Sequence, residues 1–171
     1  MSEMPDCKRR VASLEPDVYI KQMILAYEMA SLGANAPLLR EFFVVDKRLE
    51  VAINKELGKF RKGSTWMTSH VTHRKHANII YKMYCNAVPE NANFKRPLSA
   101  QELLSLSRTY LLEHNNEHAD INRIHYIFKY LSDGTFARKL CSTCGIDFIF
   151  HYERNYNHCP FCEKDSKLFK R

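Results

Sequence analysis

The sequence has no long run of apolar residues. Its longest purely apolar runs, such as Phe42-Phe43-Val44-Val45, are far too short to cross a bilayer. The amino terminus carries Lys8-Arg9-Arg10, but no apolar segment follows these charges, so we expect no secretory signal. We therefore expect a cytoplasmic protein without a membrane partner. Only five glycines and six prolines occur in 171 residues, which excludes a collagen-like or low-complexity chain.

Sequence motifs of common enzymes are also missing. The chain contains no H-E-x-x-H, no G-x-S-x-G and no Walker loop. No pair of acidic residues stands out as a site for a catalytic metal. We therefore expect that the protein is not an enzyme, and we keep an enzyme acting on nucleic acid as an alternative.

Basic residues are concentrated in the middle of the chain. The sequence has 26 Lys and Arg against 19 Asp and Glu, a formal net charge of +7. Residues 35–100 contain twelve basic and five acidic side chains, and residues 136–171 contain seven and four. This distribution favours a polyanion as partner, bound with an affinity that falls steeply as salt rises. Nucleic acid is the leading partner class, and the alternative is that the charge only maintains solubility.

Four of the six cysteines form two C-x-x-C pairs that are separated by fourteen residues. Two residues between paired cysteines allow a tight turn to direct both thiolates at one ion, and two such turns complete a tetrahedral site. Four thiolates leave no open position for water, so such a metal is structural. The sequence therefore predicts one structural Zn²⁺ with the ligands Cys141, Cys144, Cys159 and Cys162.

Three alternatives to this zinc site stay open. Iron can also occupy a site of four thiolates. A redox C-x-x-C usually lies at the start of a helix, whereas residues 146–150 are typical of a strand. His158 directly precedes Cys159 and can replace one thiolate in a Cys3His site, although we expect His151 and His158 to lie at the surface or beside the ligands.

Before the cysteines, apolar residues recur at three- and four-residue spacing. This periodicity predicts a mainly α protein with a multi-helix body over residues 1–134 and a C-terminal four-cysteine zinc ribbon over residues 135–171. The first predicted helix starts near Pro16 and ends before Gly33. We expect its apolar stripe to be core, and this stripe consists of Ile20, Met23, Ile24, Tyr27 and Ala30.

Local signals mark the later helices. A long helix is predicted over residues 68–87, and its three histidines, His70, His73 and His76, are interpreted as a polar surface rather than a metal site. Residues 99–102 match a capping box. Asp120 is the predicted cap of a helix that Gly134 ends.

Residues 38–57 resemble a helix-turn-helix. One short helix is predicted from about Pro37 to Phe43, and Asp46 can cap a second. The turn lacks the glycine often found in DNA-reading versions, so an ordinary helical hairpin with a solvated basic face is the alternative. We predict phosphate contacts on the second helix and the loop after it, at Lys47, Arg48, Lys55, Lys59, Arg61 and Lys62.

Several short segments match one known family in their order and at compatible intervals. They are Ala30-Ser31-Leu32-Gly33-Ala34, Arg48-Leu49, Lys55-Glu56-Leu57-Gly58, residues 62–66, Cys85-Asn86-Ala87, Phe148-Ile149, His151 and the two C-x-x-C pairs. Over about residues 18–163 the chain thus resembles the FlhC family of flagellar transcriptional regulators. The loop between Gly58 and Trp66 is shorter than in the family and lacks its prolines, so DNA contacts there are not carried over.

The resemblance implies a mainly helical subunit of a hetero-oligomer. Such a subunit joins an FlhD-type protein, binds duplex promoter DNA and recruits RNA polymerase to activate flagellar genes, and the family's zinc ligands fall on the four paired cysteines. We also expect a two-fold assembly, because one basic module of this size makes few base contacts. The alternative is an RNA-binding zinc-ribbon protein that stacks bases on Phe148, Phe150, Tyr152 and Tyr156, or a nucleic-acid enzyme that uses the ribbon as a handle.

Overall fold

A computed structural model describes residues 15–45, 47–48, 51–52, 55, 66–91, 94, 96–115, 117–154 and 156–163. This part of the chain is mainly helical and has one two-stranded sheet. None of its helices is both long and apolar enough to cross a membrane. The elements are α2 (Pro16–Ser31), α3 (Ala36–Phe42), α5 (Trp66–Ser69), α6 (Val71–Ala87), the 3₁₀ helix η1 (Pro89–Asn91), α7 (Ala100–His114), α8 (Ile121–Ser132), β1 (Phe136–Leu140) and β2 (Asp147–His151).

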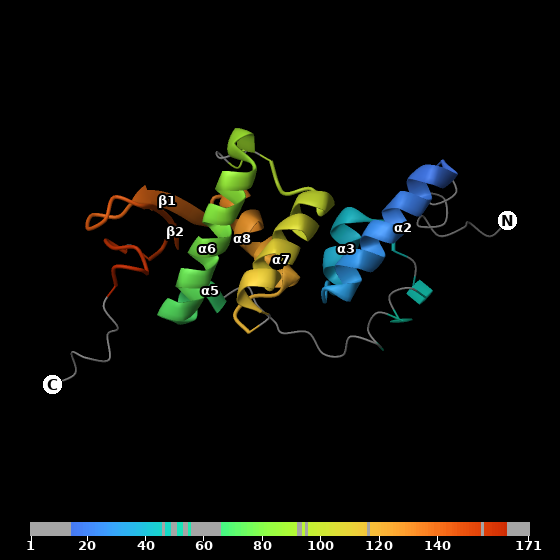
Figure 1. The fold of residues 1–171 in the computed structure, drawn as a ribbon, viewed down its shortest axis with the longest axis horizontal. Coiled ribbons are helices and arrows are strands. Elements are labelled where there is room, and N and C mark those ends of the chain that lie inside the picture. Colours follow the sequence, from blue (N-terminus) through green and yellow to red (C-terminus); the bar gives the residue numbers. More distant parts are fainter. Residues whose placement is uncertain are drawn as a thin grey trace.

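The elements follow one another along the long axis of the molecule. Figure 1 shows the β1–β2 hairpin at one end, α2 at the other, and α6, α7 and α8 between them. Helix α6 contacts α7, α8 and β2, whereas α2 contacts α7 and α3. The central core is therefore shared by three helices and the inner face of the hairpin. Its largest fully buried side chains include Tyr81, Tyr84, Tyr110, Leu103, Leu104, Ile121, Ile124 and Ile127.

Side-chain caps fix the starts of three helices. Ser99 Oγ accepts a hydrogen bond from the Glu102 N–H, and the Glu102 carboxylate accepts one from the Ser99 N–H, which confirms the predicted capping box of α7. Asp120 accepts from the Arg123 N–H and caps α8, as the sequence predicts. Asn35 caps α3 in the same way. After α8 the chain turns at Gly134, whose φ of +81° suits a residue without a Cβ.

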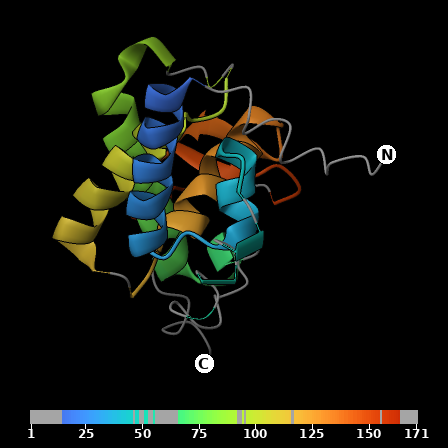
Figure 2. The same ribbon diagram turned by 90° about the vertical axis from the view of Figure 1, so that its right-hand side faces the viewer.

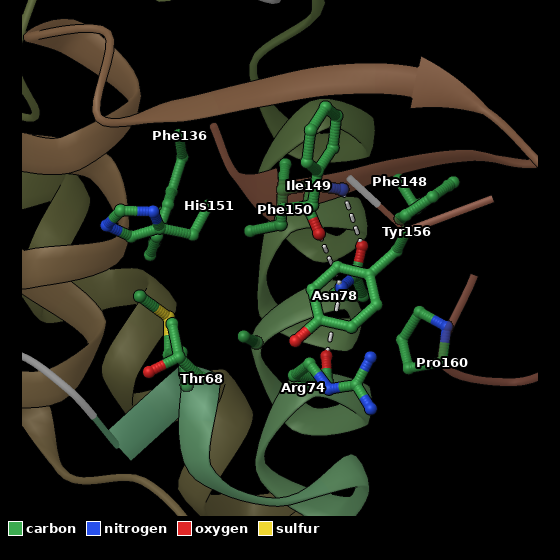
Figure 3. A pocket seen from close by; sticks show the side chains of 12 residues that line it. Thr68, Arg74, Asn78, Phe136, Phe148, Ile149, Phe150, His151, Tyr156 and Pro160 are labelled. Atoms are coloured by element: carbon green, nitrogen blue, oxygen red, sulfur yellow. Dashed lines mark hydrogen bonds between the residues drawn. The ribbon is translucent and has the colours of Figure 1, made fainter. Parts of the chain in front are cut away.

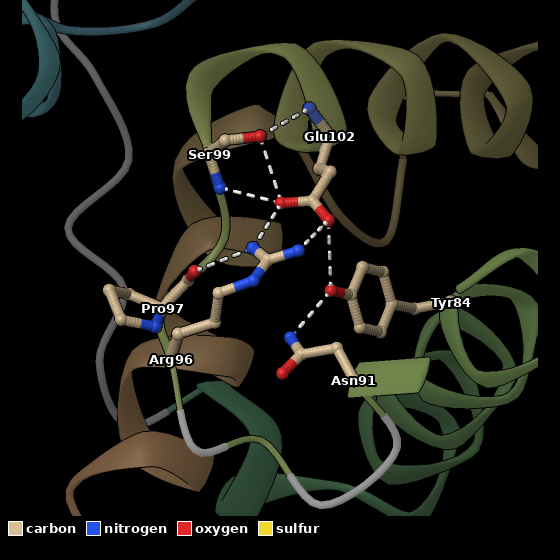
Figure 4. A network of polar contacts seen from close by, with 6 residues as sticks. All are labelled: Tyr84, Asn91, Arg96, Pro97, Ser99 and Glu102. Atoms are coloured by element: carbon tan, nitrogen blue, oxygen red, sulfur yellow. Dashed lines mark hydrogen bonds and ion pairs between the residues drawn. The ribbon is translucent and has the colours of Figure 1, made fainter. Parts of the chain in front are cut away.

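The Glu102 carboxylate also holds the segment before α7 in place. Figure 4 shows it accepting two hydrogen bonds of 2.7 Å from the Arg96 guanidinium and one of 3.3 Å from the Tyr84 hydroxyl. The hydrogen bonds from Arg96, together with those from Ser99, outweigh burial and lower the pKa of Glu102 to about 2. Asn91, at the end of η1, donates to the Tyr84 hydroxyl, so this network joins α6, η1 and α7.

The structure differs from the sequence predictions in two helices. The helix predicted over residues 68–87 is divided, because His70 has extended backbone angles and separates α5 from α6. Helix α2 has the predicted bounds, but the prediction that its stripe is core is wrong at three positions. Ile20, Ile24 and Tyr27 are 56%, 55% and 72% exposed, and the buried face of α2 instead consists of Ala26, Met29 and Ala30.

Candidate metal centre

Two tight turns bring four cysteines together beside the β1–β2 hairpin. Cys141 follows β1 directly, and its turn closes with a hydrogen bond from the Gly145 N–H to the Cys141 carbonyl. Gly145 has φ +69°, a conformation in which glycine avoids steric strain. In the second turn, the Cys162 N–H donates to the Cys159 carbonyl over 3.0 Å. Each C-x-x-C pair therefore forms one compact loop, as its spacing predicts.

The four sulfurs are placed for a single metal ion. The Sγ atoms of Cys141, Cys144, Cys159 and Cys162 all lie within 4.8 Å of one another, and those of Cys144 and Cys159 are 3.6 Å apart. Thiolates at 2.3 Å from one zinc ion in a tetrahedron are about 3.8 Å apart. None of the described cysteines forms a disulfide. The cluster can therefore hold a metal ion with four sulfur ligands.

The electrostatics of the cluster also fit a cation. The Cys159 N–H donates to Cys141 Sγ over 3.2 Å and lowers the pKa of Cys141 to about 5. The pKa of Cys162 is instead raised to about 12, chiefly by the hydrogen bond between Cys162 and Cys144. Burial and hydrogen bonds with the sulfurs of Cys159 and Cys141 act in the same direction. Four adjacent thiolates repel one another, so all four lose their protons only when a bound cation offsets their charge.

Neither histidine near the cluster takes a ligand position. The His158 ring is exposed, and its Nδ1 lies 2.8 Å from Thr143 Oγ1 and 3.1 Å from Ser142 Oγ. His151 Nδ1 accepts from the Glu153 N–H over 3.3 Å. Within the described residues, the only group of metal-ligating side chains that converges is the set of four cysteines. The arrangement therefore favours four thiolates over the Cys3His alternative.

The hairpin beside the metal centre is attached to α6 by a buried amide. Asn78 is 3% exposed, and its Oδ1 accepts from the Ile149 N–H over 2.8 Å while its Nδ2 donates to the Ile149 carbonyl over 3.2 Å. Figure 3 shows this pairing beside a cavity of about 20 Å³, which has room for one water molecule. One side chain on α6 thus binds both backbone polar groups at the centre of β2.

A second contact joins α6 to the turn that carries the last ligand. Arg74 on α6 lies 2.6 Å from the carboxylate of Glu163, the residue after Cys162, and its side chain is only 15% exposed. Its guanidinium also covers the Tyr156 ring at 4.3 Å from the centroid. Near the start of β2, the Tyr81 hydroxyl donates to the Asp147 carboxylate. Contacts to α6 therefore occur both at the start of β2 and in the segment after β2 that carries the last two ligands.

The sequence provides only a weak signal for these anchoring residues. Asn78 lies among the apolar residues Ala77, Ile80 and Tyr81, and a polar residue on a buried helix face indicates a specific partner. Arg74 and Glu163 are 89 positions apart and carry no motif. The strand β1, which pairs antiparallel with β2, was also not predicted.

The predicted phosphate-binding residues are described only in part. Lys47, Arg48 and Lys55 have helical backbone and exposed side chains. The other three, Lys59, Arg61 and Lys62, lie outside the described residues, as do Asp46 and the whole segment 56–65. The helix-turn-helix over residues 38–57 therefore stays a prediction, with a short helix, α3, at its start.

The histidines of α6 form a polar cluster rather than a metal site. His76 Nδ1 lies 2.8 Å from the Tyr110 hydroxyl, and its ring stacks on His118 with centroids 4.1 Å apart. Burial lowers the pKa of His76 to about 4, and the neighbouring His118 and His114 act in the same direction. His73 Nδ1 lies 3.1 Å from the Trp66 carbonyl. This cluster stabilises the contact between α6 and α7 in its neutral form.

Ribbon aromatics have different degrees of exposure. Phe148 is 1% exposed and packs with Cys141 and Cys159, and Phe150 and Tyr156 are half-buried against this small cluster. Tyr152, at 60% exposed, is the exception among these four residues. Packing around the metal centre therefore accounts for three of them.

No protein-family model matches the sequence, and no curated protein matches it significantly.

Proposed function

We propose that this chain is a zinc-containing, DNA-binding subunit of a hetero-oligomeric transcriptional activator of the FlhC type. In this proposal it acts with an FlhD-type subunit, binds duplex promoter DNA and recruits RNA polymerase to flagellar genes. The observation that carries the proposal is the set of four convergent thiols in a basic, mainly helical chain. The matching segments described above, from Ala30 to Cys162, connect this arrangement to the family.

The role of the metal in this proposal is structural. When bound, zinc supplies a cross-link that holds the two cysteine turns together. The residues of the chain then transmit this order to the body, since Glu163 pairs with Arg74 and Ile149 pairs with Asn78. The metal-bound turns and α6 are thereby kept in one arrangement, and no covalent step is required.

Basic side chains are proposed to supply most of the DNA affinity. Lys47, Arg48 and Lys55 are exposed and can each neutralise a phosphate, which releases counterions and sets the orientation of the protein on the duplex. Lys59, Arg61 and Lys62 follow in the sequence and are assigned the same role. Sequence preference then comes from a few base contacts or from the ease of bending the DNA.

Duplex DNA is favoured over single-stranded RNA because of how the ribbon aromatics are placed. Stacking on bases requires an exposed ring, and Phe148 is buried beside two cysteines. Tyr152 alone offers a largely exposed ring among the four aromatics considered. One such ring supports only weak binding of unpaired bases.

The proposal is tested by co-expression with an FlhD-type protein. We expect a stable complex with one zinc ion per copy of this chain, which protects upstream DNA of flagellar genes in a footprint. Its affinity for that DNA should exceed its affinity for random duplex and should fall as salt rises. A Cys159→Ser variant should lose zinc and the footprint, whereas Cys85→Ser serves as the control because Cys85 lies on α6, outside the cluster.

Three results would contradict the proposal. The first is equal affinity for promoter and random duplex, and the second is an affinity that does not change with salt. The third is stronger competition by single-stranded RNA than by promoter DNA, which would favour the RNA-binding alternative.

A further inference from the structure

Helix α2 carries a stripe of large apolar side chains that nothing in the described structure covers. Ile20, Ile24 and Tyr27 are spaced four and three residues apart, so they lie on one face of the helix. They are 56%, 55% and 72% exposed. The helix already buries another face, with Ala26 and Met29, against the body. The stripe is therefore a second apolar face of α2, separate from the face through which α2 packs on the body.

The position of α2 leaves this stripe accessible. The helix lies at the end of the molecule opposite to the hairpin, and Figure 2 shows it in front when that end faces the viewer. A contiguous apolar patch on an outer helix is a common mark of a protein interface. Three large side chains with these exposed fractions present roughly 400 Å², at about 200 Å² for each fully exposed one.

The charges beside the stripe indicate which partner fits it. Lys21 and Glu28 are seven residues apart, which is two helical turns, so they lie on the same flank of α2. The midpoint between them coincides with the middle of the stripe, next to Ile24. The Lys21 side chain is 79% exposed and its Nζ lies 3.9 Å from the Asp17 carboxylate, while the Arg108 guanidinium lies 3.1 Å from the Glu28 carboxylate. Both side chains are exposed enough to reach a second partner across the contact.

This arrangement is complementary to itself. Consider an antiparallel pair of α2 helices related by a two-fold axis that passes near Ile24. The flank that carries Lys21 and Glu28 then lies on the same side of the pair in both copies. Lys21 of each copy then lies beside Glu28 of the other, and Ile20 of each lies beside Tyr27 of the other. In a parallel pair the two-fold axis runs along the helices, so the flank with Lys21 and Glu28 lies on opposite sides of the two copies and these charges do not meet.

We propose that the exposed face of α2 is the contact between two copies of this chain, which pair antiparallel about a two-fold axis at Ile24. Two such patches bury about 800 Å² together, against about 1,600 Å² for a standard interface, so the dimer is reversible and its dissociation constant is in the micromolar range. Because the hairpin lies at the other end of each copy, the two metal centres lie at the outer ends of the dimer. This inference concerns self-association and does not depend on the DNA-binding proposal.

The mass of the full chain in solution tests the proposal. In analytical ultracentrifugation of the zinc-loaded protein from about 1 to about 200 µM, we expect a monomer that converts to a dimer. Ile24→Glu places two carboxylates at the two-fold axis and should raise the dissociation constant by at least about tenfold. Leu112→Glu is the matched control, because Leu112 is an 88% exposed apolar residue on a different helix, α7, and is not part of the stripe. Circular dichroism should show that both variants stay folded.

Two charge reversals test the antiparallel arrangement. Lys21→Glu and Glu28→Lys should each weaken self-association, because each places like charges opposite each other. When the two variants are mixed, every flank contact joins opposite charges again, so the mixture should form a heterodimer more readily than either variant forms a homodimer. A monomeric wild-type chain over the whole concentration range would overturn the proposal, even if a different protein then proved to cover α2. Equal effects of Ile24→Glu and Leu112→Glu, or a mixture that forms no heterodimer, would also overturn it.

Discussion

The side-chain amide of Asn78 pairs with both backbone polar groups of Ile149, 71 residues away in the sequence. Its Nδ2 also donates to the Arg74 carbonyl over 2.9 Å, so the amide uses both its donor and its acceptor sides inside the protein. Because Asn78 is buried, water cannot replace these partners. This pairing is therefore a specific requirement for docking the hairpin on α6.

Removal of this amide should destabilise the fold. Asn78→Ala leaves the Ile149 N–H and carbonyl without partners, and we expect the free energy of unfolding to fall by about 2 to 4 kcal/mol. Asn86→Ala, at an exposed position of the same helix, should change it by less than about 0.5 kcal/mol. Urea unfolding followed by circular dichroism measures both. Similar losses in the two variants would show that the pairing with Ile149 contributes little.

Loss of one metal ligand should release the hairpin from the body. Cys159 is fully buried in the small cluster with Cys141 and Phe148, so Cys159→Ser should lower the metal content from about one ion per chain to near zero. We then expect the backbone amides of β1 and β2 to exchange hydrogen for deuterium faster. Cys85→Ser should retain both the metal and the protection. Full protection of β2 in metal-free protein would contradict a structural role of the ion.

The histidine cluster between α6 and α7 should make stability depend on pH. The folded-state pKa of His76 is lowered to about 4 from its ordinary 6.5, so the folded protein favours the neutral ring. Its contribution is complete above pH 6.5 and is lost as the pH falls from 6.5 to 4, because the unfolded chain then binds a proton that the folded chain does not.

A single variant isolates this effect. His76→Gln removes the titration. The unfolding free energy of wild type relative to the variant should therefore fall by about 1 kcal/mol between pH 8 and pH 5. This value is discounted for solvent screening because the ring is only partly buried. Taking the difference cancels the effect of acid on the metal centre, which both proteins share. A difference that does not change with pH would show that His76 does not titrate in this range.

Neutralising two exposed cations should weaken DNA binding without altering the fold. Lys47→Gln with Arg48→Gln should reduce the slope of log affinity against log salt by about 2, with similar losses on every duplex sequence. The control pair, Arg108→Gln with Lys129→Gln, removes the same charge from α7 and α8. Equal slopes for both double variants would mean that net charge, rather than the segment around residues 47–48, sets the affinity.

Local signals predicted the parts of this fold that depend on near neighbours. The caps Ser99 and Asp120 act within three residues, and the C-x-x-C pairs each close one turn, so their sequence patterns carry the needed information. The bounds of α2 were predicted for the same reason. The convergence of all four cysteines followed from the spacing of the pairs and the preference of zinc for four ligands.

The remaining features depend on which surfaces meet. Helix α2 has two apolar faces, and periodicity shows that Ile20, Ile24 and Tyr27 share one face without showing which face meets the body. The pairing of Asn78 joins a side chain to a backbone, so no residue type at position 149 reveals it. The histidine cluster likewise joins α6 to the segment after α7 through tertiary packing.

A two-stranded sheet has an unprotected side on each strand, and such sides can recruit strands from other molecules. Arg138 on β1 faces Ile149 on β2, and the Ile149 N–H and carbonyl are directed at α6, where Asn78 engages them. An incoming strand therefore finds no free donor and acceptor at the centre of β2. The Asn78 amide, which docks the hairpin on α6, therefore also blocks strand addition at the outer edge of β2.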